Sequence, residues 1–375
     1  MEDTADNQTV VPEGPYIDRY FRATVKTEAS DLHLKVGQPA KLRIKGILKS
    51  TTGDILEKKK TQEMIFELLS KEQLEKFRTN GSLDFAYELG KEARFRVNIF
   101  RQRGNVSLVA RRVNAVIPKF EELNLPATLE TIAQASQGLV LVVGPTGSGK
   151  STTIASMIDY INRSRQCHIV TIEDPIEYIF EDGKANVSQR EVGLDVNDFE
   201  QALEHMMRQD PDVVFVGEMR DPKTVAAGVR AAETGHVVFA TMHSANASQA
   251  IQRLLDLFPH EERDMIRKTL SMTLKAIISQ VLLPGIKKGA SRVPAIEILL
   301  TNPSVRKLIA EERESDLPSV IRSCEHEGMQ DFTYTLCDLV ERGMVDPKDA
   351  FFHAPNKDEL KMALKGIRSS SSSLL

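Results

Sequence analysis

The sequence predicts an α/β fold preceded by a smaller α+β domain. Near-continuous apolar runs recur in the second part of the chain, with helix-like segments between them: GLVLVVG, HIVTIED, DVVFVGE and HVVFATMHS. Strands buried on both faces have this pattern, and their alternation with helices is typical of a parallel sheet. Between about residues 16 and 115, short stretches instead alternate polar and apolar residues, as half-buried strands do.

The first domain is assigned to residues 16–113. PYIDRYFRATVKT predicts a helix, and the stretches DLHLKV, KLRIKGIL, RFRVNIF and SLVARRV predict strands. Between them, TQEMIFELLSKEQLEKFRTNG predicts one further helix. The polar residues 1–15 are expected to be a disordered lead. Two prolines and weak periodicity place a linker at residues 114–127.

The second domain is assigned to residues 128–366. After residue 260 the chain is expected to be helical, including all of EERDMIRKTLSMTLKAIISQVLL. The serine-rich residues 367–375 are expected to be a disordered tail.

Composition sets limits on the class of protein. The 375 residues are 41% hydrophobic and 27% charged, which is typical of a soluble globular chain. A net charge of −4 gives no overall basic field for nucleic acid, and no apolar run approaches the roughly 20 residues that cross a bilayer. The acidic N-terminus lacks the features of a signal peptide, so the expected compartment is the cytoplasm. Three scattered cysteines without a CxxC pair predict neither a disulfide framework nor a tetracysteine zinc site.

GPTGSGKST fits the phosphate-binding pattern G-x-x-x-x-G-K-[ST], with an apolar strand before it and a helix-like segment after it. The glycines let the backbone N–H groups converge on phosphate oxygens, and the helix start adds a positive dipole end. Lys150 is expected to reach the β- and γ-phosphates, and Ser151 to bind Mg²⁺. The expected nucleotide-binding residues are Gly144, Pro145, Thr146, Gly147, Ser148, Gly149, Lys150, Ser151 and Thr152.

Two further strands end in acids. In DVVFVGEMRD, Glu218 is placed at the carboxyl end of the sheet, where it could polarise the attacking water or bind Mg²⁺ through a water. Arg220 and Asp221 could shape the loop that follows. VTIEDPIEY ends in Glu173, Asp174 and Glu177, whose carboxylates suit a site with Mg²⁺. The alternatives are a plain surface acid for Glu218 and a capping or solvated turn for the second group.

Histidines and arginines complete the candidate residues. His236 and His243 bracket the apolar run VVFATM, where His243 could sense the γ-phosphate or contact a neighbouring subunit; the alternative is a satisfied core histidine. Alternation places Arg94 and Arg96 on one face of a predicted strand, and Arg111 lies on a different predicted strand. Arginines supplied from another domain or subunit could stabilise phosphate charge, and the alternative is a solvated cationic face.

The ordered motifs GPTGSGKST, TIEDPIE, QREVG, VFVGEMRDP, AAETGH and ATMHS resemble the secretion ATPases of the type II/type IV pilus superfamily. Within it the chain is similar to the PilT/PilU group of pilus-retraction motors, over nearly its whole length. The resemblance implies a PAS-like N-terminal domain, a RecA-like P-loop ATPase domain with a helical C-terminal portion, and a ring-shaped homohexamer that binds ATP and Mg²⁺.

By the same resemblance, Glu218 is the Walker B catalytic glutamate, and Glu173, Asp174 and Glu177 form the Asp box. His236 and His243 form the His box, and Arg94, Arg96 and Arg111 are supplied toward nucleotide. The chain lacks the extra N-terminal domain and the zinc site usual in assembly relatives, which favours retraction. GVRAAETG replaces the retraction signature AIRAGETG, and the ending HAPNKDELKMALKG resembles the accessory motor PilU more closely.

The partners implied are an inner-membrane pilus platform protein and a second retraction ATPase, with peripheral docking at the inner membrane and no nucleic acid. Other hypotheses stay open at this point: a pilus-assembly or secretion ATPase of the superfamily, a RecA-type nucleic-acid motor stimulated by single-stranded DNA, or a nucleotide-sensing accessory scaffold.

Overall fold

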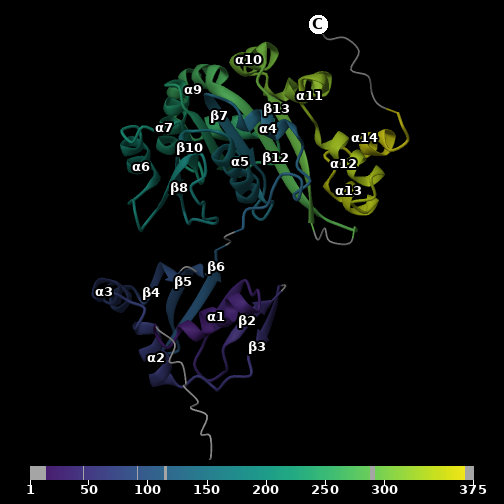
Figure 1. Cartoon of the computed structure of the whole chain (residues 1–375). Helices are drawn as coiled ribbons and strands as arrows, with labels where there is room; N and C mark the ends of the chain where they lie inside the picture. The colour runs from purple at the N-terminus through teal and green to yellow at the C-terminus, as the bar shows by residue number, and fades with distance from the viewer. Residues whose placement is uncertain (1–13, 45, 91, 114–115, 288–291, 368–375) are drawn as a thin grey trace, which may run out of the picture. The chain divides into compact units, whose positions relative to one another are not determined.

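The computed structural model describes residues 14–44, 46–90, 92–113, 116–287 and 292–367. The chain divides into two compact units, Met1–Ala115 and Val116–Leu375 (Figure 1). Most of the predicted disordered lead and tail lies outside the described residues. Within the described segments, no helix combines the length and the apolar character needed to cross a membrane.

The described residues of the first unit form an antiparallel sheet, in strand order β3-β2-β1-β6-β5-β4, with three helices. Its helices are α1 (Asp18–Lys26), α2 (Lys58–Phe66) and α3 (Lys71–Asn80). Its strands are β1 (Asp31–Leu34), β2 (Lys41–Ile44), β3 (Ile47–Ser50), β4 (Ser82–Leu89), β5 (Ala93–Gln102) and β6 (Asn105–Arg112).

Most of the predicted elements of this unit are confirmed. The long helix predicted around residues 61–81 is wrong in one respect, because it is two helices. Ser70 accepts a hydrogen bond from the backbone N–H of Gln73, and the Gln73 side chain accepts one from the N–H of Ser70. This capping box starts α3 as a new helix. Strand β4 was not predicted.

The second unit is built on a seven-stranded sheet in the order β13-β12-β7-β11-β10-β8-β9. Its strands are β7 (Gly138–Val143), β8 (His168–Glu173), β9 (Asn186–Glu191), β10 (Val213–Val216), β11 (Val237–Met242), β12 (Leu274–Pro284) and β13 (Arg292–Leu300). Its α-helices are α4 (Thr128–Ala133), α5 (Lys150–Ser164), α6 (Phe199–Met206), α7 (Pro222–Glu233), α8 (Ala247–Asp256), α9 (His260–Thr273), α10 (Pro303–Ala310), α11 (Leu317–Ser323), α12 (Phe332–Glu341), α13 (Pro347–His353) and α14 (Lys357–Ala363). Two short 3₁₀ turns are η1 (Glu314–Asp316) and η2 (Glu325–Glu327).

The strands of this sheet are buried on both faces, as their apolar runs predict. On β7, Leu139, Leu141 and Val143 belong to a core shared with α6 through α11. The intervening Val140 and Val142 belong to a second core shared with α4 and α5. Because successive side chains of a strand point to opposite faces, one central strand contributes to both cores. The parallel α/β prediction is therefore confirmed for this unit.

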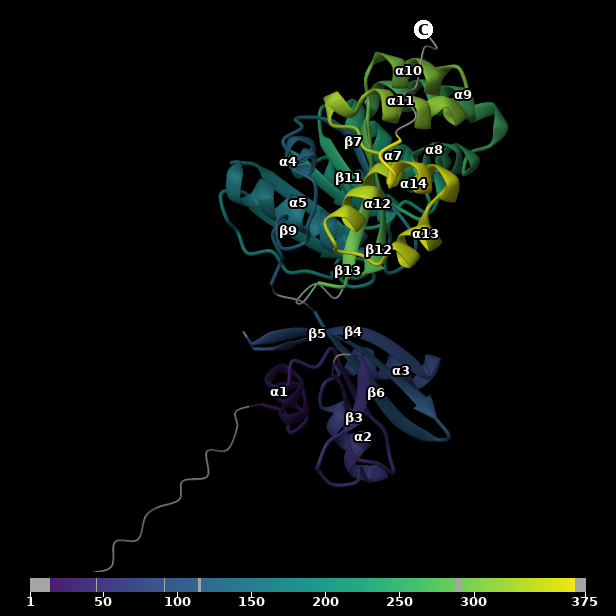
Figure 2. The same cartoon turned by 90° about the vertical axis from the view of Figure 1, so that its right-hand side faces the viewer.

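The prediction of helix for residues 274–283 is wrong, because they form β12, which lies in the sheet between β7 and the edge strand β13. It runs parallel to β7 and pairs antiparallel with β13 from Ala276↔Leu300 to Pro284↔Arg292. The run IISQVLL is apolar almost throughout, so periodicity alone does not separate a buried strand from a buried helix. Helices α12 and α13 pack against this hairpin (Figure 1 and Figure 2).

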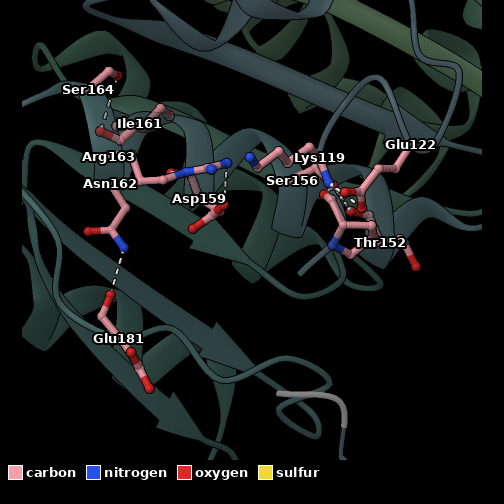
Figure 3. A network of polar contacts seen from close by, with 11 residues as sticks. Lys119, Glu122, Thr152, Ser156, Asp159, Ile161, Asn162, Arg163, Ser164 and Glu181 are labelled. Carbon is pink, nitrogen blue, oxygen red and sulfur yellow. Dashed lines mark hydrogen bonds and ion pairs between the residues drawn. The ribbon is translucent and has the colours of Figure 1, made fainter. Parts of the chain in front are cut away.

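The predicted linker is also too long, because residues 116–127 pack into the second unit. Phe120 is buried in the core that includes α5. The Ser156 hydroxyl on α5 donates to the backbone oxygens of Pro118 (2.6 Å) and Thr152 (3.0 Å). Figure 3 shows Lys119 and Glu122 beside this part of α5. Weak periodicity here reflects an irregular segment that is nevertheless packed.

Candidate functional site

The loop after β7 is shaped by glycines that other residues could not replace. Gly144 has φ +155°, and a Cβ placed there would lie 2.2 Å from the backbone oxygen of Gln280 on β12. Gly149 has φ +86° and immediately precedes α5. The positive φ angles and the close approach of β12 therefore require glycine at both positions. Strand, loop and helix follow one another as the motif requires.

Lys150 is the first residue of α5, and its side chain folds back into the loop that precedes this helix. Its side chain is buried, and its Nζ donates hydrogen bonds to the backbone oxygens of Gly144 (2.9 Å) and Pro145 (3.0 Å). Burial lowers the pKa of Lys150, while the charges of Glu218 and Glu177 act in the opposite direction. A lysine held at the centre of such a loop is placed to meet phosphate oxygens.

A cavity of about 290 Å³ opens beside the loop. It brings together predicted residues from four segments: Thr146, Gly147, Lys150, Ser151, Glu173, Asp174, Glu177, Glu218 and His243. It also contains residues that were not predicted to be functional: Pro175, Phe199, Phe215, Gly217 and Thr241, together with Arg220. The cavity lies at the carboxyl ends of parallel strands, which is where α/β sheets bind ligands.

Glu218 follows β10 and faces this cavity between Arg220 and His243. One carboxylate oxygen accepts a hydrogen bond from Nη2 of Arg220 at 2.6 Å, and the other lies 3.3 Å from Nε2 of His243. Burial would raise the pKa of Glu218, but the hydrogen bond and charge of Arg220, with the charges of His243 and Lys150, hold it below its usual value. Glu218 is therefore a carboxylate at neutral pH, as a group that polarises water must be.

Asp221 has the loop-shaping role that was considered for it. Its side chain accepts a hydrogen bond from the backbone N–H of Thr224 at 2.9 Å and caps α7. Arg220 has a larger role than predicted, because it holds Glu218. The signal for this role was the spacing of two residues between opposite charges in the loop that follows β10.

The acids at the end of β8 and in the turn that follows it divide into one buried group and two that are exposed. Glu173 is buried and accepts hydrogen bonds from the Thr171 hydroxyl (2.7 Å) and from Nε2 of Gln189 (3.1 Å). Asp174 and Glu177 are exposed and line the cavity. Glu177 accepts a hydrogen bond from the Ser151 hydroxyl at 3.1 Å, which joins this segment to the first turn of α5. Thr152 makes a second such contact, 2.9 Å from the Tyr178 hydroxyl.

The free energy of unfolding of the nucleotide-free chain is expected to fall as pH rises from about 4.5 to about 7. Burial raises the pKa of Glu173 to about 7 from 4.5. In this window the native state holds a proton that the unfolded chain has released, so stability is lost as pH rises. The two values correspond to on the order of 3 kcal/mol. Denaturant unfolding at several pH values should show this loss in the wild type but not in Glu173→Gln.

Glu181→Gln is the matched control, because Glu181 is an exposed acid of the same segment. It should keep the wild-type dependence on pH. An unchanged pH dependence in Glu173→Gln would show that Glu173 is not the group responsible.

The two histidines are not brought together. His243 lies in the cavity with Glu218. His236 precedes β11, and its backbone oxygen accepts a hydrogen bond from the N–H of Gly138, at the start of β7. Since the loop follows the end of β7, the six residues of that strand place His236 about 20 Å from it. Within one chain the structure therefore does not bring His236 to the cavity, and its Nδ1 lies 3.0 Å from the backbone oxygen of Ala231.

The predicted arginines lie in the first unit. Arg96 and Arg111 are direct cross-strand neighbours on β5 and β6, and Arg111 is opposite Asp31 on β1. Nε of Arg111 donates to Oδ1 of Asp31 at 2.8 Å. Burial would raise the pKa of Asp31, but hydrogen bonds from Arg111 and Ser30 and the charges of Arg111 and Arg43 hold it low. Arg94 lies 3.8 Å from Glu88. Acidic partners are thus present for Arg111, which contacts Asp31, and for Arg94, which contacts Glu88.

The donor set of the cavity is made of oxygens. It contains the Ser151 hydroxyl and the carboxylates of Glu173, Asp174, Glu177 and Glu218. Oxygen ligands suit a hard cation such as Mg²⁺. Across the part of the chain that the structure describes, no three histidine, cysteine or acidic side chains cluster as a preformed metal cage.

Gln280 was missed altogether, because its segment was predicted to be helix. It is buried in β12, and its Nε2 donates to the backbone oxygen of Ser148 at 2.7 Å. A polar residue within the apolar run IISQVLL was the available signal, since a buried carboxamide requires partners.

Comparisons with known proteins agree with this geometry. The family model described as "Type II/IV secretion system protein" matches residues 5–333. The type IV pilus retraction ATPase PilT of Pseudomonas aeruginosa is 41% identical, with 87% of this chain and 94% of that protein covered. The type IV pilus ATPase PilU of the same organism is 38% identical, with 93% and 91% covered. The crystal structure of the pilus retraction motor PilT with bound ADP superposes with a TM-score of 0.85, at 42% identity, covering 93% of this chain and 99% of that one.

Proposed function

The chain belongs to the type II/IV secretion system protein family, and we propose that it is an ATPase that powers retraction of a type IV pilus. The observation that carries the proposal is the cavity beside the phosphate loop, where Lys150, Glu218 and His243 meet. A cationic side chain for phosphates and an ionised carboxylate for water are the two groups that hydrolysis of a triphosphate requires. The similarity to PilT and PilU supports pilus retraction as the work performed.

In this proposal the loop N–H groups and Lys150 hold the phosphates of ATP. Mg²⁺, with Ser151 and the acids after β8 as its protein neighbours, supplies positive charge when bound. Glu218 orients and polarises the attacking water and accepts its proton. Arg220 keeps Glu218 ionised, because its guanidinium places positive charge beside one carboxylate oxygen, and the imidazole of His243 lies beside the other. Both therefore hold in place the carboxylate that accepts that proton.

The working assembly that we propose is a homohexamer at the cytoplasmic side of the inner membrane. It would dock on the pilus platform protein there and work with a second retraction ATPase. Arg94, Arg96 and Arg111 would be supplied to nucleotide across a subunit boundary, where arginines stabilise the charge of the transferred phosphoryl group. Loss of those contacts after hydrolysis would allow the conformational change that does work.

Deletion of the gene is expected to leave cells with excess surface pili that do not retract. Fibres that are assembled but no longer withdrawn accumulate, so electron microscopy should count more pili per cell than in the wild type. Complementation with the wild-type gene should restore the count, and complementation with Glu218→Gln should not. Cells without pili would contradict retraction and favour pilus assembly.

A further inference from the structure

Gln280 lies against the phosphate loop from the side of β12. Its side chain is 2% exposed and has two hydrogen-bond partners. Nε2 donates to the backbone oxygen of Ser148 at 2.7 Å, and Oε1 accepts from the hydroxyl of Thr153 at 2.8 Å. One carboxamide therefore joins the loop to the first turn of α5. The backbone of Gln280 also passes so close to Gly144 that only glycine fits there.

The carboxamide determines the direction of one peptide group of the loop. In a trans peptide the C=O and the following N–H point in opposite directions. A Ser148 oxygen that is held toward β12 therefore turns the N–H of Gly149 away from β12. Phosphate binding by such a loop depends on N–H groups that converge on one point. The Ser148 hydroxyl is buried and finds no hydrogen-bond partner among the described residues, so it does not share this task.

We propose that Gln280 is a positioning residue for nucleotide binding, which fixes the Ser148–Gly149 peptide so that its N–H faces the phosphates. Glycine at position 149 makes the contact possible, because a Cβ there would lie 2.8 Å from Nε2 of Gln280. The neighbouring Ser279 points to the opposite face of β12, where its hydroxyl donates to Oε1 of Glu297 at 3.1 Å. The contact with the loop is thus specific to Gln280.

Gln280→Met is expected to weaken ADP binding by the full-length chain about tenfold. Without the carboxamide, the Ser148–Gly149 peptide is not held in the binding orientation beforehand, and fixing it on binding costs free energy. Titration calorimetry with ADP measures this change. The matched control is Gln330→Met. The carboxamide of Gln330 likewise joins a backbone oxygen, that of Ile296 (3.1 Å), to a hydroxyl, that of Thr335 (2.6 Å), but it lies outside the nucleotide cavity. Gln330→Met should lose thermal stability and keep its affinity for ADP.

Gln280→Glu provides a test that a purely structural role would not satisfy. A protonated glutamic acid has one donor and one acceptor, so it can replace both hydrogen bonds. The ionised form has no donor and places a negative oxygen against the Ser148 carbonyl. ADP affinity relative to the wild type at the same pH should therefore be near normal in acid and fall as pH rises. Gln280→Met should be weakened by the same factor at every pH.

The inference rests on the proposed nucleotide site but not on hydrolysis or on pili. ADP binding by the wild type needs neither, so a failure to retract pili would not affect this result. Wild-type affinity in Gln280→Met would overturn the inference. Equal loss of affinity in Gln280→Met and Gln330→Met would overturn it too, because the effect would then be one of general destabilisation.

Discussion

Glu218→Gln is expected to lower the ATP turnover rate by about 10²–10⁴-fold while leaving ATP binding nearly unchanged. The amide keeps the shape of the carboxylate but cannot accept a proton from water. It also gives up the charge that Arg220 and His243 hold in place at 2.6 Å and 3.3 Å. Phosphate release from the purified chain measures turnover, and titration with a non-hydrolysable ATP analogue measures binding.

Glu233→Gln is the matched control for Glu218→Gln. Glu233 is an exposed acid at the far end of α7, outside the cavity, and its substitution removes the same charge. It should turn over ATP at the wild-type rate. A Glu218→Gln chain that hydrolyses ATP as fast as the wild type would show that another group activates the water.

Lys150→Gln is expected to weaken nucleotide binding about a hundredfold, since charge-assisted hydrogen bonds to phosphate are the strong ones. Burial already opposes the charge of Lys150, so its removal should not lower the melting temperature. Lost binding then cannot be attributed to unfolding. Titration with ADP measures the affinity, and Lys71→Gln, an exposed lysine on α3, is the control. Undiminished affinity in Lys150→Gln would remove the lysine from the phosphate site.

The sequence predicts the phosphate loop and the four apolar strands around it correctly, because each carries a strong local signal. Glu218 and His243 could be placed at one edge of the sheet for the same reason, since the ends of parallel strands coincide. His236 lies at the opposite end of β11 from His243, because the motif that contains both histidines spans a whole strand.

The errors in the predicted fold have a physical origin. Strand β12 is stabilised by its pairing with β13, the next strand of the chain, and with β7, which is far from it in sequence, and local periodicity does not report such pairing. The contacts of Gln280 depend on that pairing and could not be derived without it. Phe120 likewise becomes part of the α5 core only through the fold, so proline content alone suggested a linker.

Strand β7, which leads into the phosphate loop, has all six residues buried and pairs with β11 on one edge and β12 on the other. A strand that is hydrogen-bonded on both edges and packed on both faces cannot shift without breaking two ladders and two cores. Strand β7 therefore keeps a fixed position relative to the other strands of its unit. Any movement that accompanies the nucleotide cycle must therefore occur in the segments beyond the ends of the strands. Strand β7 itself keeps its position in the sheet while nucleotide binds to the loop that follows it.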